Sequence, residues 1–116
     1  MIGLDRLLDR PCVLAAGQFS EQGEMLRGVG KLDENQMKEV AGICAKAEVN
    51  FKKLVGDLDG ATDMPWKNLT GWIVMGENLA LFVMDNGGVI VDSTKADFNR
   101  LLVDLFGPTA GEVPVP

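Results

Sequence analysis

The chain has 116 residues, which is enough for one domain with a single hydrophobic core. Its formal net charge is −6 and its Lys and Arg residues are scattered along the sequence, so it lacks the cation clusters with which proteins bind nucleic acids or anionic membranes. No apolar run approaches the ~18 residues that span a bilayer, and residues 1–6 do not read as a signal peptide. We therefore expect a cytoplasmic protein that binds neither nucleic acid nor membranes.

A short helix and a β-hairpin are predicted at the start of the chain. Leu4, Leu7 and Leu8 have the spacing of one helix face, and Pro11 ends that helix. Two strand-like runs follow at residues 12–19 and 24–29. The turn-forming residues between them include Gly23, which accepts a positive φ without strain.

A long central helix comes next. Asp33 and Gln36 have the spacing of a capping box, in which each side chain binds the other residue's backbone amide. An apolar stripe then recurs at helical spacing and predicts the face that packs on the core: Val40, Cys44, Ala47, Phe51, Leu54 and Leu58. The pair Asp59 and Gly60 predicts that the helix ends near Leu58.

The same helix carries small residues on a face away from this stripe. They are Gly42, Ala45, Val49 and Gly56. Small side chains allow two helix backbones to approach closely, and glycine inside a helix costs roughly 1 kcal/mol relative to alanine. We interpret the face as a helix–helix contact between subunits. The alternative is a small-residue surface without a partner.

The second half predicts three strands and a final helix. Strand-like runs occupy residues 70–75, 79–84 and 89–91, and the Asn-Gly pair at 86–87 is typical of a hairpin. Thr94 and Asp97 predict a helix start. The helix carries apolar residues at 98, 101, 102, 105 and 106 and ends at Gly107 and Pro108. We expect residues 1–107 to form the domain and residues 108–116 a flexible tail.

The predicted order is helix, two strands, helix, three strands, helix, which favours an α+β fold with a five-stranded antiparallel sheet and helices on both faces. From about Leu4 to Phe106 the chain resembles the roadblock / dynein light chain family. The resemblance rests on element order and on residues 14–17, 21–26 and 78–83, which look like that family's first hairpin and apolar central strand. We expect the chain to represent an uncharacterised bacterial branch of the family.

The resemblance implies a role in protein binding. Members of the family are commonly homodimers in which the central helices pair and the third strands join two sheets into one. They act as scaffolds or as regulators of small Ras-like GTPases. Trp72, Ile73 and Val74, in the apolar third strand, are therefore assigned to the interface together with the small-residue face.

Catalytic, metal and cofactor residues are not predicted. The chain has no His, which excludes Ser-His-Asp and Cys-His catalysis. Its two cysteines, Cys12 and Cys44, cannot close a zinc site alone; free thiols are favoured and a disulfide is left open. Residues 57–63 fail the EF-hand register, and the glycines do not form a phosphate-binding loop.

The leading hypothesis is therefore a non-enzymatic homodimeric module that binds a protein, with a small GTPase as a candidate partner and no cofactor. The alternative is a small-molecule sensor with a pocket between sheet and helices. Such a pocket would be lined by Trp66, Trp72, Phe82 and methionines. Side chains of these types lie more often in a core than in a binding pocket.

Overall fold

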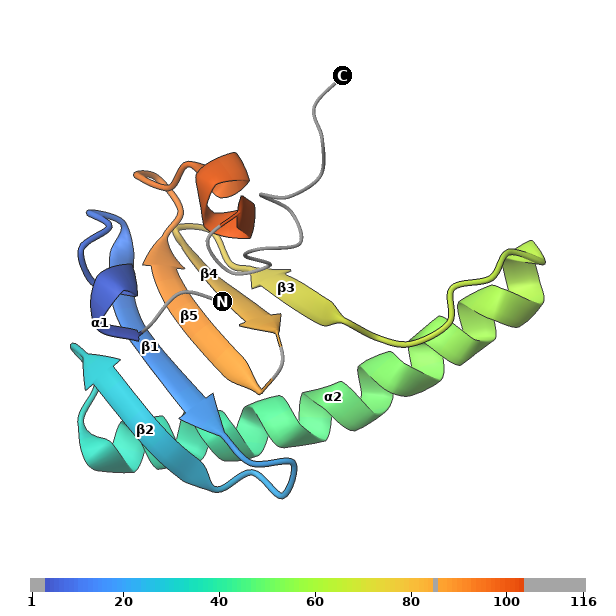
Figure 1. Cartoon of the computed structure of the whole chain (residues 1–116), viewed down its shortest axis with the longest axis horizontal. Helices are drawn as coiled ribbons and strands as arrows, with labels where there is room; N and C mark the ends of the chain where they lie inside the picture. Colours follow the sequence, from blue (N-terminus) through green and yellow to red (C-terminus); the bar gives the residue numbers. More distant parts are fainter. Residues whose placement is uncertain (1–3, 85, 104–116) are drawn as a thin grey trace.

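The computed structural model describes residues 4–84 and 86–103 and is built around one antiparallel sheet (Figure 1). The elements are α1 (Leu4–Leu7), β1 (Val13–Phe19), β2 (Met25–Gly30), α2 (Glu34–Thr62), β3 (Gly71–Met75), β4 (Leu79–Met84) and β5 (Gly87–Asp92). A further helix begins at residue 98 and is described as far as residue 103. The predicted order of elements is confirmed.

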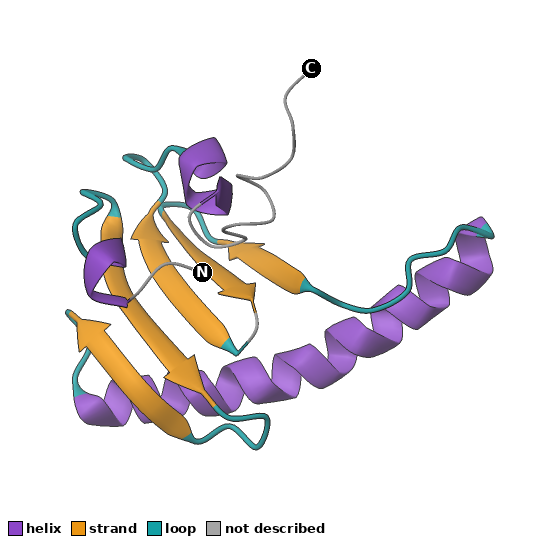
Figure 2. Ribbon diagram, in the orientation of Figure 1, coloured by secondary structure: helices purple, strands orange, loops and turns teal. Residues whose placement is uncertain are grey.

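The five strands lie in the order β2-β1-β5-β4-β3 (Figure 2). All pairings are antiparallel, and β1 joins the first hairpin to the β3-β4-β5 meander by pairing with β5. This order leaves β2 and β3 as the two edges of the sheet. The predicted five-stranded antiparallel sheet is therefore confirmed.

Helices cover both faces of the sheet. On one face α2 packs over Phe19, Trp72 and Val83 through Ala41 and Cys44. On the other face, α1 and the helix at 98–103 close a second core, whose buried members include Leu7, Phe82, Val89, Val91 and Leu101. Because strand side chains alternate between faces, the almost wholly apolar strand β4 supplies both cores.

The start of α2 follows the prediction, but its end does not. Asp33 Oδ1 accepts the Gln36 amide at 2.8 Å and Gln36 Oε1 accepts the Asp33 amide at 2.9 Å, which completes the capping box. The predicted end near Leu58 is wrong, because α2 continues to Thr62 and closes at Asp63 in the left-handed conformation. Gly60 lies inside the helix as a result.

The start of the last helix also differs in detail from the prediction. Asp97 caps it, with Oδ1 accepting the Arg100 amide at 3.1 Å. Thr94 is not part of a capping box, since its hydroxyl and its amide both donate to Asp92 Oδ1. The predicted apolar residues 105–106, the helix end at 107–108 and the tail at 108–116 lie outside the described residues.

Candidate interaction surface

The central helix α2 extends beyond the sheet on the side of β3. The rings of Phe51 and Trp72 stack with centroids 4.9 Å apart, which marks the point where α2 passes over the edge strand. Beyond that point α2 extends past the sheet (Figure 1). We call residues 52–62 of α2 the arm. The sheet of the same chain does not reach the arm.

An apolar flank runs along α2 from the body of the molecule into the arm. Ile43 is 61% exposed and Leu54 is 48% exposed. With the half-buried Ala47 and Leu58 they follow the spacing i, i+4, i+11, i+15, which places them on one side of a helix. The prediction that Leu54 packs in the core is wrong, because the sheet ends at β3, before Leu54 is reached.

Strand β3 offers an unprotected edge. One side pairs with β4 along its whole length, and the described residues include no strand on its other side. Its sequence, Gly-Trp-Ile-Val-Met, has no charge and no proline, the two features that most often block edge-to-edge pairing. At the opposite edge β2 carries Arg27 and two glycines, and its pairing with β1 is interrupted by a bulge. The edge formed by β3 is therefore the one open to another strand.

The side chains of β3 divide between the two faces of the sheet. Trp72 pairs with Val83 and Val74 with Leu81, so both point to the face covered by α2. Trp72 is only 8% exposed, and its assignment to the interface is corrected because it belongs to the core of its own chain. Val74 is 48% exposed on the face covered by α2, and Ile73 is exposed on the opposite face.

The predicted small-residue face of α2 also divides. A Cβ added at Gly56 would have no atom within 4 Å, and Val49 is 69% exposed, so these two lie on open surface. Ala45 and Gly42 differ: a Cβ at Gly23 would lie 3.1 Å from the Ala45 Cβ and 3.3 Å from the Gly42 Cα, so the β1–β2 turn packs on both. Both residues are half-buried beside this turn, and the assignment of the small-residue face to an interface stays a prediction.

The sequence interpretation missed the exposure of this flank. It placed Ala47, Leu54 and Leu58 in the core stripe and did not assign Ile43. The exposed members could not be separated from the stripe in the sequence, since nothing there tells how far the sheet reaches along the helix. The position of the sheet edge therefore determines which residues of the flank are exposed.

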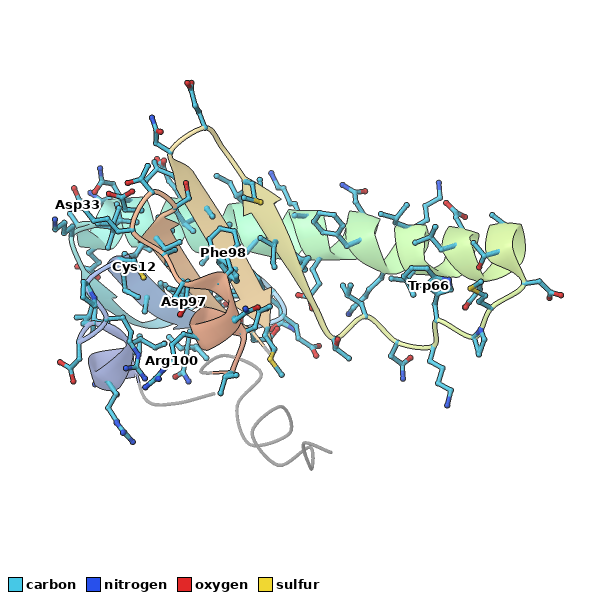
Figure 3. All side chains as sticks on the ribbon, turned by 90° about the horizontal axis from the view of Figure 1, so that it is seen from above. Cys12, Asp33, Trp66, Asp97, Phe98 and Arg100 are labelled. Atoms are coloured by element: carbon cyan, nitrogen blue, oxygen red, sulfur yellow. The ribbon has the colours of Figure 1, made fainter. Side chains whose placement is uncertain are left out.

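The end of the arm is fixed by side-chain hydrogen bonds. The Trp66 amide donates to Asp59 Oδ1, and the Trp66 indole donates to Thr62 Oγ1 at 3.0 Å. The Thr62 hydroxyl donates in turn to the Leu58 carbonyl at 2.6 Å. Figure 3 shows Trp66 against the far end of the helix, so the loop after α2 is bound to the arm.

The pocket expected for a small-molecule sensor is not formed by the predicted residues. Trp66 lies on the arm, Trp72 belongs to the core under α2, and Phe82 belongs to the core on the opposite face. A different apolar cavity lies between the sheet and α2, lined in part by Met25 and Met37. It measures about 20 Å³, which is room for about one water molecule.

Among the described residues, no three His, Cys, Asp or Glu side chains are placed to hold a metal ion. Cys12 and Cys44 are both buried free thiols. Burial, reinforced by the Glu48 carboxylate, raises the pKa of Cys44 to about 11, so its thiol is protonated and unreactive at neutral pH.

The fold of this chain matches that of solved roadblock domains. A Roadblock/LC7 domain from Streptomyces avermitilis superposes with a TM-score of 0.71 at 17% identity, covering 89% of this chain and 85% of that domain. The gliding protein MglB of Thermus thermophilus gives a TM-score of 0.65 at 17% identity, covering 80% and 70% of the two chains. An MglB with a tetrameric arrangement gives 0.69 at 17% identity, covering 85% and 74%.

The family assignment rests on the sequence. Residues 3–106 match the family described as "Uncharacterized conserved protein (DUF2173)", and the chain belongs to that family. No curated protein shows a significant sequence match. In the described part of the chain, no helix is both long enough and apolar enough to cross a bilayer. The roadblock neighbours share the fold of this chain.

Proposed function

We propose that the chain is a non-enzymatic homodimeric module of the cytoplasm that binds a protein partner. The observation that carries the proposal is the continuity of two uncovered apolar features, the flank of α2 and the edge of β3. Exposed apolar patches that are continuous over two elements typically mark association sites. An uncharged open edge strand is a template for pairing with another chain.

In a dimer whose two-fold axis lies beside β3, the partner chain would cover both the flank of α2 and the edge of β3. Antiparallel pairing of β3 with the partner's β3 would join two sheets, and the arm of each chain would then lie over the sheet of the other. Because Phe51 already sits above the edge strand, Leu54 would lie next to the axis. The exposed Val74 would lie under the partner's arm, where its side chain is removed from water.

Two further observations support the proposal. The resemblance to the roadblock family implies homodimers with paired central helices, and the tetrameric arrangement of MglB is a case of self-association on this fold. The resemblance also implies a small Ras-like GTPase as partner. The charge of −6 suits a basic patch on such a partner and disfavours binding of a free nucleotide triphosphate.

Cysteine cross-linking at the axis tests the homodimer. Leu54→Cys is expected to form an intermolecular disulfide under mild oxidation, because a disulfide needs Cα atoms about 4.4–6.8 Å apart and residues next to an axis meet their own copies. Val49→Cys is the matched control. Val49 belongs to the small-residue face that the sequence assigned to the interface, but the packing proposed here leaves that face outside the contact, so this variant is expected to remain monomeric on non-reducing gels. Equal cross-linking of both variants, or of neither, contradicts the proposed packing.

The GTPase role has a separate test. The protein is titrated into the source organism's small Ras-like GTPases, with GTP hydrolysis and nucleotide release as readouts, while the chain alone is titrated with a fluorescent GTP analogue. We expect a changed rate in at least one GTPase and no binding of the analogue by the chain alone. Micromolar binding of the analogue to the chain would contradict the non-enzymatic proposal.

A further inference from the structure

The side of α2 that carries the flank has a polar residue one helical turn before Leu54 and another one turn after it. These residues are Asn50 and Asp57. Ala47 and Ala61 lie two turns before and two turns after Leu54. The five residues share one side of the helix, because their spacing alternates between three and four positions. The order of side-chain types along this side is small, polar, leucine, polar, small, and it is the same when read from either end of the helix.

The same five residues are accessible in the single chain. Asn50, Asp57 and Ala61 are exposed, Ala47 is half-buried, and Leu54 is 48% exposed. Their relative positions are fixed, because α2 runs without a break through this stretch (Figure 1). Within the described part of the chain, no hydrogen bond or ion pair uses the side chain of Asn50 or of Asp57. The Asn50 amide and the Asp57 carboxylate are therefore available to a partner.

A two-fold axis at Leu54 matches this order with itself. Across such an axis the two copies of α2 run antiparallel, so a residue before Leu54 in one chain lies beside a residue after Leu54 in the other. Asn50 then lies beside the partner's Asp57, and Ala47 lies beside the partner's Ala61. The alanines let the two helices approach closely, because the distance between packed helices depends on the side chains at the contact.

We propose that the Asn50 amide of each chain donates a hydrogen bond to the Asp57 carboxylate of the other, and that these two symmetric bonds set the register of the homodimer. The inference rests on the proposed homodimer and adds the residues that select the partner. Apolar contacts alone tolerate a shift of one helix along the other, whereas a polar pair inside an apolar contact disfavours every register that leaves it unpaired. Hydrogen bonds to a carboxylate are charge-assisted and strong. The occupant that fits this side of α2 is thus a second copy of the chain.

Moving the carboxylate tests the pair. Asn50→Asp would place carboxylates opposite carboxylates on both sides of the axis, and we expect sedimentation equilibrium to give a dimer dissociation constant about 10- to 100-fold higher. The double variant Asn50→Asp/Asp57→Asn again has one amide and one carboxylate in each pair and keeps the net charge of the unmodified chain. We expect its dissociation constant to return to within about 3-fold of the original value.

Val49→Asp is the matched control, because it adds the same charge as Asn50→Asp at the next position, where the side chain is 69% exposed and outside the proposed contact. We expect it to change the dissociation constant less than about 3-fold. The inference is overturned if Val49→Asp and Asn50→Asp weaken the dimer equally, or if the double variant dimerises no better than Asn50→Asp. Either result leaves the homodimer standing, whereas a single-chain mass for the unmodified protein contradicts the homodimer and this inference together.

Discussion

At the scale of single residues, the packing around two paired glycines decides what each position tolerates. Gly17 of β1 and Gly88 of β5 lie opposite each other in the sheet, and both line the small cavity under α2. A Cβ at Gly88 would meet its nearest atom at 3.6 Å, which is ordinary contact. A Cβ at Gly17 would lie 2.9 Å from the Met25 Cε and 3.2 Å from the Arg27 carbonyl oxygen. The two positions are therefore not equivalent.

The pair Gly88→Ala and Gly17→Ala tests this difference. We expect Gly88→Ala to raise the free energy of unfolding by about 0.5 kcal/mol, because it restricts the unfolded chain and fills part of a cavity. Gly17→Ala is expected to lower it by about 1–3 kcal/mol through overpacking. Urea denaturation of both variants measures the difference. The same sign for both would contradict the packing described here.

The buried thiol of Cys44 makes stability depend on alkaline pH. Its pKa is raised from 9.0 to about 11 in the folded chain, so the folded state favours the neutral thiol. The contribution is fully present below pH 9 and is lost as the pH rises from 9 towards 11, where the unfolded chain releases its proton first. We expect about 2 kcal/mol of unfolding free energy to disappear over that range. In Cys44→Ala this part of the decline should be missing, and an unchanged decline would contradict the assignment.

At the scale of elements, α2 illustrates what local sequence determines. Its start could be predicted from Asp33 and Gln36, because a capping box is a contact between residues three apart. Its end could not, because Asp59 and Gly60 resemble a stop signal. The helix continues since the Asp59 carboxylate accepts an amide hydrogen bond from Trp66, seven residues later. A local sequence pattern predicts a helix end wrongly when its side chain forms a hydrogen bond with a more distant segment.

Removing the Asp59 carboxylate is expected to loosen the end of the arm without unfolding the domain. In Asp59→Ala the Trp66 amide keeps only the Met64 carbonyl, at 3.0 Å, as an acceptor, and the loop after α2 loses one of its two contacts with Thr62 and Asp59. We expect hydrogen exchange of the Trp66 amide to accelerate about 5- to 30-fold, as for a lost hydrogen bond of about 1–2 kcal/mol. Core amides of β1 and β5 should be unaffected. An unchanged exchange rate at Trp66 would contradict the role of Asp59.

At the scale of the whole molecule, the sequence could predict the fold but only part of the surface. Alternating apolar strands, turn residues and helix caps are local, and they determine the element order that the sheet confirms. The exposure of a side chain, by contrast, depends on segments that are distant in the sequence. Trp72 is buried by the segments that pack on it, Ala45 is half-buried beside the β1–β2 turn, and Leu54 is exposed because the sheet stops short of it. The candidate surface therefore depends on where elements end relative to each other.

The solution mass of the protein tests the proposed homodimer most directly. Sedimentation equilibrium at about 100 µM is expected to give twice the chain mass of 12.5 kDa. Leu54→Glu should lower the mass to that of one chain, because a charge would be buried at the axis. Val49→Glu, on the outer face, should leave the dimer intact. A single-chain mass for the unmodified protein, or a dimer that Leu54→Glu leaves unchanged, would contradict the account.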